Sequence, residues 1–64
     1  MNNEIQFQLK NAENYDEFFM NANIMIAEEM AEARNTTVDD LLTDEIESRA
    51  REYWDEYQSA HFPF

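Results

Sequence analysis

The apolar residues from residue 15 onward recur with the spacing of an α-helix, and this spacing narrows the possible folds more than any other feature. Within residues 14–34 they stand three or four positions apart, which gathers them on one side of a helix. A second run with the same spacing covers residues 38–60. Only Asn35-Thr36-Thr37 separates the two runs. The sequence therefore predicts a mainly α-helical chain whose two long amphipathic helices form a hairpin.

The short break between the two runs contains residues suited to end one helix and begin another. Asn35 tolerates the left-handed conformation that follows many helices, in a chain that has no glycine. Thr37 is a suitable N-cap, and Asp39 and Asp40 would follow it in a first helical turn, where negative charge is favourable. We therefore expect the second helix to begin directly after Thr37.

Residues 4–10 show a different pattern, in which apolar and polar residues alternate. Alternation is typical of a half-buried β-strand. A single strand leaves its backbone donors and acceptors unpaired, and the chain holds no second strand candidate. We therefore expect a homodimer in which this strand pairs with its copy as a two-stranded antiparallel ribbon, the alternative being an ordered arm on the helices. The apolar side chains of the dimer ribbon would be Ile5, Phe7 and Leu9.

Short segments flank the predicted elements. Asn11 or Asn14 is positioned to cap the first helix. Pro63 cannot continue the second helix, so a short aromatic tail should follow it. The prediction is one domain, residues 1–64, with a strand at about 4–10, helices at about 14–34 and 38–60, and the tail at 61–64.

Sixty-four residues without cysteine leave packed helices or association as the sources of stability, because no disulfide can form. The absence of cysteine fits a reducing compartment. No apolar run approaches the ~20 residues of a transmembrane helix, and the first residues lack the pattern of a signal peptide. We expect a cytoplasmic protein that does not bind membranes.

Fifteen acidic residues against four basic ones give a formal net charge of −11, and this limits the possible partners. So negative a surface repels nucleic acids and anionic membranes and attracts basic surfaces. Solubility alone needs a net charge of only about 2 to 8 in a small domain. We therefore expect the acidic helices to bind the basic surface of another protein. The residues expected to bind this partner are Glu28, Glu29, Glu32, Asp39, Asp40, Asp44, Glu52, Asp55 and Glu56.

The order strand, helix, tight turn, helix resembles that of the ribbon-helix-helix (Arc/MetJ) superfamily. Gln6-Phe7-Gln8-Leu9-Lys10 looks like the DNA-reading ribbon of that family, and residues 31–42 look like its inter-helix turn. The Phe62-Pro63-Phe64 ending is similar to that of some of its antitoxins. The resemblance implies a DNA-binding regulator or antitoxin. Its contacts with nucleic acid would come from Gln6, Gln8 and Lys10.

The charge of the chain argues against DNA binding, however. Phosphate contacts gain their free energy from Lys and Arg, and Lys10 is the only base in the predicted ribbon. The turn that would hold a phosphate carries Asp39 and Asp40 instead. A fold that resembles a DNA reader is therefore expected to compete with DNA.

No residue pattern points to catalysis or to a metal. There is no cysteine, and His61 is the single histidine. Asp39, Asp40 and Asp44 lack the spacing of a calcium-binding loop and the glycine that its turn requires. We expect no enzymatic activity, no cofactor and no metal.

The sequence favours a small acidic inhibitor that mimics nucleic acid and occupies a basic nucleic-acid-binding surface of a partner. Small phage proteins that block host defence, including anti-CRISPR proteins, are similar in size and charge. The ribbon-helix-helix regulator or antitoxin is the alternative. A plain dimerisation module, in which the charge serves solubility alone, is the third possibility.

Overall fold

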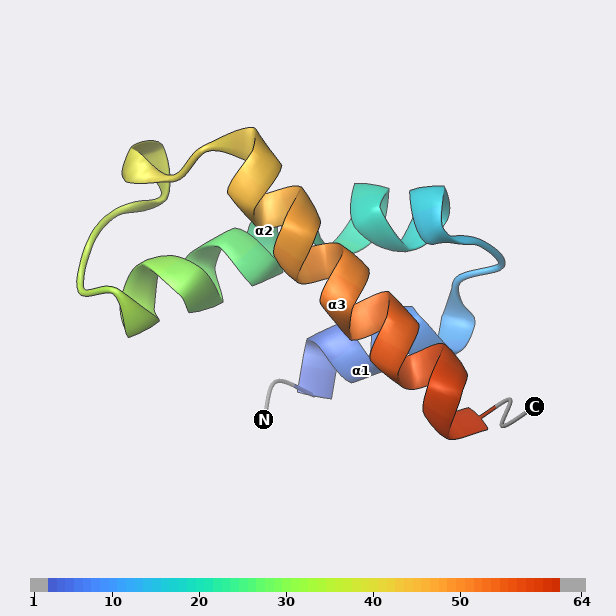
Figure 1. Cartoon of the computed structure of the whole chain (residues 1–64). Helices are drawn as coiled ribbons and strands as arrows, with labels where there is room; N and C mark the ends of the chain where they lie inside the picture. Colours follow the sequence, from blue (N-terminus) through green and yellow to red (C-terminus); the bar gives the residue numbers. More distant parts are fainter. Residues whose placement is uncertain (1–2, 62–64) are drawn as a thin grey trace.

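Residues 4–10 lie in a helix and not in a strand. The computed structural model describes residues 3–61, and helix α1 (Asn3–Asn11) occupies the segment in which alternation predicted a strand (Figure 1). Ile5 and Leu9 are buried, whereas Phe7 lies on the other side of α1 with 61% of its surface exposed. The predicted strand, and the intersubunit ribbon built on it, are therefore wrong. The four-residue separation of Ile5 and Leu9 fits a helical face as well as an alternating strand.

The backbone of α1 needs no partner strand, because a helix satisfies its own donors and acceptors. At its end the Ala12 N–H donates to the Gln8 carbonyl at 3.0 Å, and the Asn11 side-chain amide donates to the Phe7 carbonyl at 2.8 Å. Lys10 stands in the last turn, where a positive charge is favourable. The described residues contain three α-helices, one 3₁₀ turn and no strand.

Helix α2 (Tyr15–Ala33) has defined caps at both ends. Of the two candidates, Asn14 is the N-cap, and its side-chain oxygen accepts from the Glu17 N–H at 2.9 Å. Beyond the C-terminus Asn35 adopts φ 55°, which confirms its predicted left-handed conformation. The Thr36 N–H donates to the Ala31 carbonyl at 2.9 Å, and the Asn35 N–H donates to the Glu32 carbonyl at 3.1 Å. This pair of bonds is the Schellman motif, which ends the helix firmly.

The second long helix, α3 (Thr43–His61), begins later than the sequence predicted. Residues Val38–Asp40 form a separate 3₁₀ turn, η1, and the chain is extended again at Leu41. At the start of α3 the Leu42 N–H donates to the Glu45 carboxylate at 3.1 Å. A glutamate three residues beyond the N-cap is half of a capping box, and this bond sets the start of the helix.

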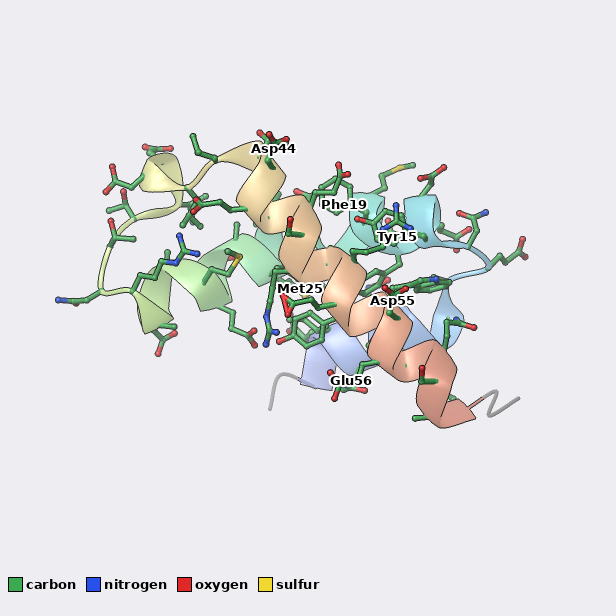
Figure 2. The ribbon with its side chains drawn as sticks, in the orientation of Figure 1. Tyr15, Phe19, Met25, Asp44, Asp55 and Glu56 are labelled. Atoms are coloured by element: carbon green, nitrogen blue, oxygen red, sulfur yellow. The ribbon has the colours of Figure 1, made fainter. Side chains whose placement is uncertain are left out.

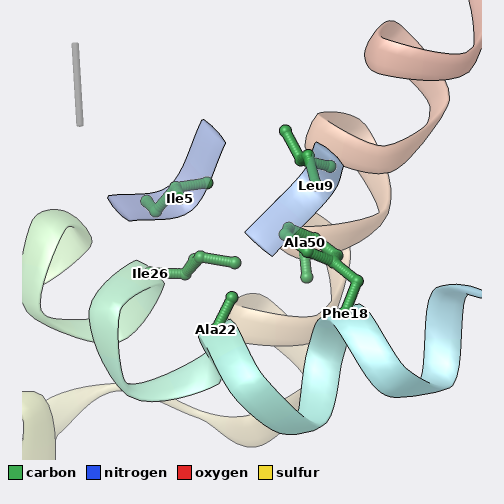
Figure 3. Packing of buried hydrophobic residues seen from close by; sticks show 6 residues of the cluster. All are labelled: Ile5, Leu9, Phe18, Ala22, Ile26 and Ala50. Carbon is green, nitrogen blue, oxygen red and sulfur yellow. The ribbon is translucent and has the colours of Figure 1, made fainter. Parts of the chain in front are cut away.

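The core is formed by all three helices within one chain. In Figure 1, α3 crosses α2 steeply and its second half passes α1. The Trp54 ring of α3 stacks on the Phe18 ring of α2, with centroids 5.8 Å apart. The central buried side chains, shown in Figure 3, are Ile5, Leu9, Phe18, Ala22, Ile26 and Ala50.

Two further observations concern the ends and the length of the helices. The predicted aromatic tail, Phe62-Pro63-Phe64, lies outside the described residues. Among residues 3–61, none of the helices combines the length and the apolar character that crossing a membrane requires.

Candidate protein-binding surface

The acidic residues predicted to bind a partner lie in three places on the molecule. Figure 2 shows Asp44 at the start of α3, and Asp55 and Glu56 towards its other end. The C-terminal half of α2 contributes Glu28, Glu29 and Glu32; η1 and the start of α3 contribute Asp39, Asp40 and Asp44; the second half of α3 contributes Glu52, Asp55 and Glu56.

Two of these nine side chains are occupied by contacts within the molecule. Glu29 is half-buried and accepts a hydrogen bond from the Tyr53 hydroxyl, which links α2 to α3. Burial, followed by this bond to Glu29, raises the pKa of Tyr53 above its usual 10.0. The Asp40 carboxylate accepts hydrogen bonds from the Thr36 and Thr37 hydroxyls, which holds the turn before η1. Glu29 and Asp40 therefore serve the fold.

The other seven predicted residues are exposed. The Glu52 carboxylate has a weak ion pair with Arg49, whose Nη1 is 3.7 Å away. The remaining six form no ion pair and no side-chain hydrogen bond with any residue of the described chain. These seven residues, called the exposed acidic set below, are Glu28, Glu32, Asp39, Asp44, Glu52, Asp55 and Glu56.

Aromatic rings hold the two arginines of α3. The Arg51 guanidinium lies 3.7 Å from the centre of the Tyr15 ring, and the Arg49 guanidinium lies 4.5 Å from the centre of the Tyr53 ring. Both distances are within the range of a cation–π contact. Burial raises the pKa of the Tyr15 hydroxyl, and the charge of Arg51 opposes this shift. The positive charges of α3 thus lie beside the tyrosines, and of the two arginines only Arg49 is also paired with a carboxylate of the described residues, that of Glu52.

The third arginine, Arg34, joins the end of α2 to the start of α3. Its Nη1 is 3.0 Å from the Glu45 carboxylate, whose other oxygen accepts the Leu42 N–H. The backbone hydrogen bond, and after it the bond from Arg34, lower the pKa of Glu45 below its usual 4.5. Glu45 is thus a structural carboxylate that receives one of the four basic side chains.

Unequal distribution of the bases leaves α2 without any positive charge. It carries five acidic residues and no basic one, whereas α3 carries six acidic residues and two arginines. The fourth base, Lys10, is exposed on α1. Of the two long helices, α2 therefore has the larger net negative charge, −5 against −4.

The residues expected to contact DNA lie on helix α1 and not on a strand. Gln6 and Lys10 are one helical turn apart on α1, whereas Gln8 points to a different side. Gln6 lines an open groove of about 340 Å³ between α1 and α3, whose other lining residues are Leu9, Arg49, Tyr53, Glu56, Tyr57 and Ala60. The ribbon through which the resemblance implied base contacts is absent from the described residues.

Sequence reasoning missed two exposed apolar side chains on α2. Met20 and Ile24 are 71% and 67% exposed, and neither belongs to the stripe that faces the core. The signal was present, because Met20, Ile24, Ala27 and Ala31 follow one another at helical spacing. The stronger stripe that contains Phe18 and Ile26 obscured it.

Comparison with known proteins gives no relative for this arrangement. No protein-family model, no curated protein and no solved structure matches the chain. Within residues 3–61, no group of three or more acidic or histidine side chains is placed to hold a metal ion.

Proposed function

We propose that this chain is a small acidic protein that binds a basic surface of a partner protein and thereby blocks nucleic acid from that surface. The observation that carries the proposal is the exposed acidic set, six of whose members have no ion pair in the described chain. Carboxylates without cations nearby keep their full field toward solvent, which steers a basic partner to them. Small phage inhibitors of host defence, including anti-CRISPR proteins, are similar in size and charge, and we propose the same class of role here.

The charge density indicates how closely the chain could imitate nucleic acid. Helix α3 has 19 residues and is therefore about 28 Å long, with a net charge of −4. One strand of B-DNA carries a charge roughly every 3.4 Å of axis, or about eight over that length. The helix would thus replace a few phosphates at selected cationic side chains. Competition with nucleic acid is expected where those side chains are essential.

Competition with nucleic acid for an isolated partner tests the proposal. The partner would be captured from a cell extract on the immobilised chain, purified, and mixed with labelled DNA or RNA. Increasing amounts of the chain should release the nucleic acid in proportion to the complex formed. A variant with Glu28→Gln, Glu32→Gln, Glu52→Gln and Asp55→Asn should release it at least tenfold less effectively, because four contacts to cations are lost.

A variant with unchanged charge provides the control. Gln6→Ala with Gln8→Ala alters two polar side chains of α1 and leaves the net charge at −11. This variant should compete as well as the wild-type chain. The proposal is wrong if the partner keeps its nucleic acid when saturated with the chain, or if the four-charge variant competes normally.

A further inference from the structure

Helix α2 has a second apolar stripe on the side away from the core. Met20 and Ile24 each follow a core residue, Phe18 and Ala22, by two positions, which is roughly 200° around the helix. The stripe continues one helical turn at a time toward the C-terminus of α2. Its four members are Met20, Ile24, Ala27 and Ala31. A surface helix of a small domain needs only one apolar face, which packs on the core. A second apolar face on the same helix therefore indicates a further binding partner.

The chain itself covers only half of this stripe. Ala27 and Ala31 are buried, with 2% and 5% of their surface exposed. Helix α2 packs against η1 as well as against α1 and α3, and the connection that carries η1 turns back over the C-terminal half of α2 (Figure 1). Met20 and Ile24, in the other half, remain 71% and 67% exposed. The fold thus leaves two large apolar side chains in line and uncovered.

Acidic residues stand at both ends of the uncovered pair. Asp16 is one helical turn before Met20, and Glu28 is one turn after Ile24. Both carboxylates are exposed, and neither has an ion pair within residues 3–61. Within α2 itself, every charged side chain on either side of this apolar pair is acidic.

We propose that Met20 and Ile24 bind a basic amphipathic helix of the partner protein. The proposal rests on the function proposed above and names the chemistry of the partner at that surface. An apolar centre with a charged rim is the usual anatomy of a protein interface. A straight row of side chains four residues apart fits the groove of another helix, whose flanking Lys and Arg would meet Asp16 and Glu28. A second copy fits poorly, because it would set a charge of −11 against −11.

Binding of designed peptides to the full chain tests this partner chemistry. Two lysine-rich helical peptides of about 18 residues, or five turns, would carry the same number of lysines. One would have leucines along one face, and the other would have glutamine at those positions. The leucine peptide should bind at least tenfold more tightly, because burying even one large apolar side chain contributes about that factor. A third peptide with leucines, but with glutamate in place of lysine, should not bind.

Variants of the chain locate the binding site. Met20→Ala with Ile24→Ala should remove the advantage of the leucine peptide, whereas Phe7→Ala, an equally exposed apolar side chain on α1, should leave it unchanged. Asp16→Asn with Glu28→Gln and Asp55→Asn with Glu56→Gln both change the net charge to −9. The α2 pair should weaken binding severalfold more than the α3 pair. Circular dichroism would verify that each variant is folded.

The outcomes separate this inference from the proposed function. If neither lysine peptide binds, the basic helix is wrong as the occupant, whereas the proposed function is decided separately by the competition with nucleic acid. Equal binding of the leucine and glutamine peptides would support the acidic surface and overturn the role of Met20 and Ile24. Binding of the glutamate peptide would also overturn it. So would a dimer, seen by sedimentation, that Met20→Ala with Ile24→Ala dissociates, because a second copy would then be the occupant.

Discussion

Glu45 shows how one side chain can join two helices. Its carboxylate accepts the Leu42 N–H at the start of α3 and pairs with Arg34 at the end of α2. The first contact was foreseeable only once the start of α3 was known, because a glutamate three residues after a helix start commonly bonds back to the N-cap. The second was not, because Arg34 is eleven positions away and its direction depends on the Schellman turn at Asn35. The role of Glu45 thus depends on where the backbone places its neighbours more than on its being a glutamate.

Replacing Glu45 by Gln should lower the unfolding temperature at neutral pH. The folded state lowers the pKa of Glu45, so its contribution is present above the usual value of 4.5 and is lost as the pH falls through the folded value. Thermal unfolding of wild type and variant should therefore differ at pH 7 and converge well below pH 4.5. Glu28→Gln, on an exposed side chain without an ion pair, is the control and should have little effect. A difference that persists unchanged at pH 2.5 would contradict this role.

Asn35 should tolerate glycine but not alanine. Its φ of 55° is accessible to glycine without strain, whereas a Cβ with no polar side chain costs about 1 kcal/mol in that region. Urea denaturation should show Asn35→Ala to be about 1 kcal/mol less stable than the wild-type chain. Asn35→Gly should be equal to the wild type or slightly more stable. Equal stability of the alanine and glycine variants would rule out the left-handed turn.

Among the helices, α1 shows that a short pattern of apolar residues can fit either a helix or a strand. Ile5 and Leu9 lie on one face in a helix and also in a strand, and Phe7 alone distinguishes the two. Residues 4–10 contain one β-branched residue among several good helix formers, which was the available signal for a helix. The longer runs near residues 14–34 and 38–60 are less ambiguous, because their apolar residues keep helical spacing over many successive turns.

The late start of α3 could not be read from the sequence, since Thr37 and Asp40 resemble a helix start but form a separate turn.

Alanine substitutions on α1 distinguish a helix from a strand. Leu9→Ala should destabilise the chain by about 2–5 kcal/mol, because a fully buried side chain leaves a cavity. Phe7→Ala should change stability by about 0.5 kcal/mol or less, since its side chain is mostly exposed. The check is chemical denaturation of both variants. In a strand the two residues would share a face, so similar large losses for both would contradict α1.

The link between α2 and α3 should weaken at alkaline pH. Burial, and then the bond to Glu29, raise the pKa of Tyr53, so its contribution to stability is present below pH 10 and is lost as the pH rises through the folded value. Alkaline unfolding followed by circular dichroism should begin above pH 10, and Tyr53→Phe should remove part of this dependence. Tyr57→Phe is the comparison on the same helix. Identical pH profiles for the wild type and Tyr53→Phe would contradict this role of Tyr53.

For the whole molecule, the sequence shows that the surface charge is negative, but it does not show which acidic residues remain exposed on that surface. The net charge of −11 was evident at once. The bond from Tyr53 to Glu29 crosses 24 positions of the chain, so no local pattern revealed that Glu29 serves the fold. The helical spacing of the exposed apolar pair on α2 was present in the sequence, but the packing of the three helices decided that this pair stays uncovered. Tertiary contacts therefore decided which predicted binding residues remain available.

The salt dependence of binding to the purified partner tests most directly whether exposed carboxylates carry the interaction. The affinity of the chain should fall steeply between about 50 and 500 mM salt, because exposed charges are screened over shorter distances as salt rises. The variant with Glu28→Gln, Glu32→Gln, Glu52→Gln and Asp55→Asn should bind more weakly and show a clearly shallower dependence. An affinity that stays constant across this range, or the same slope for both proteins, would contradict an acidic surface built to meet a basic one.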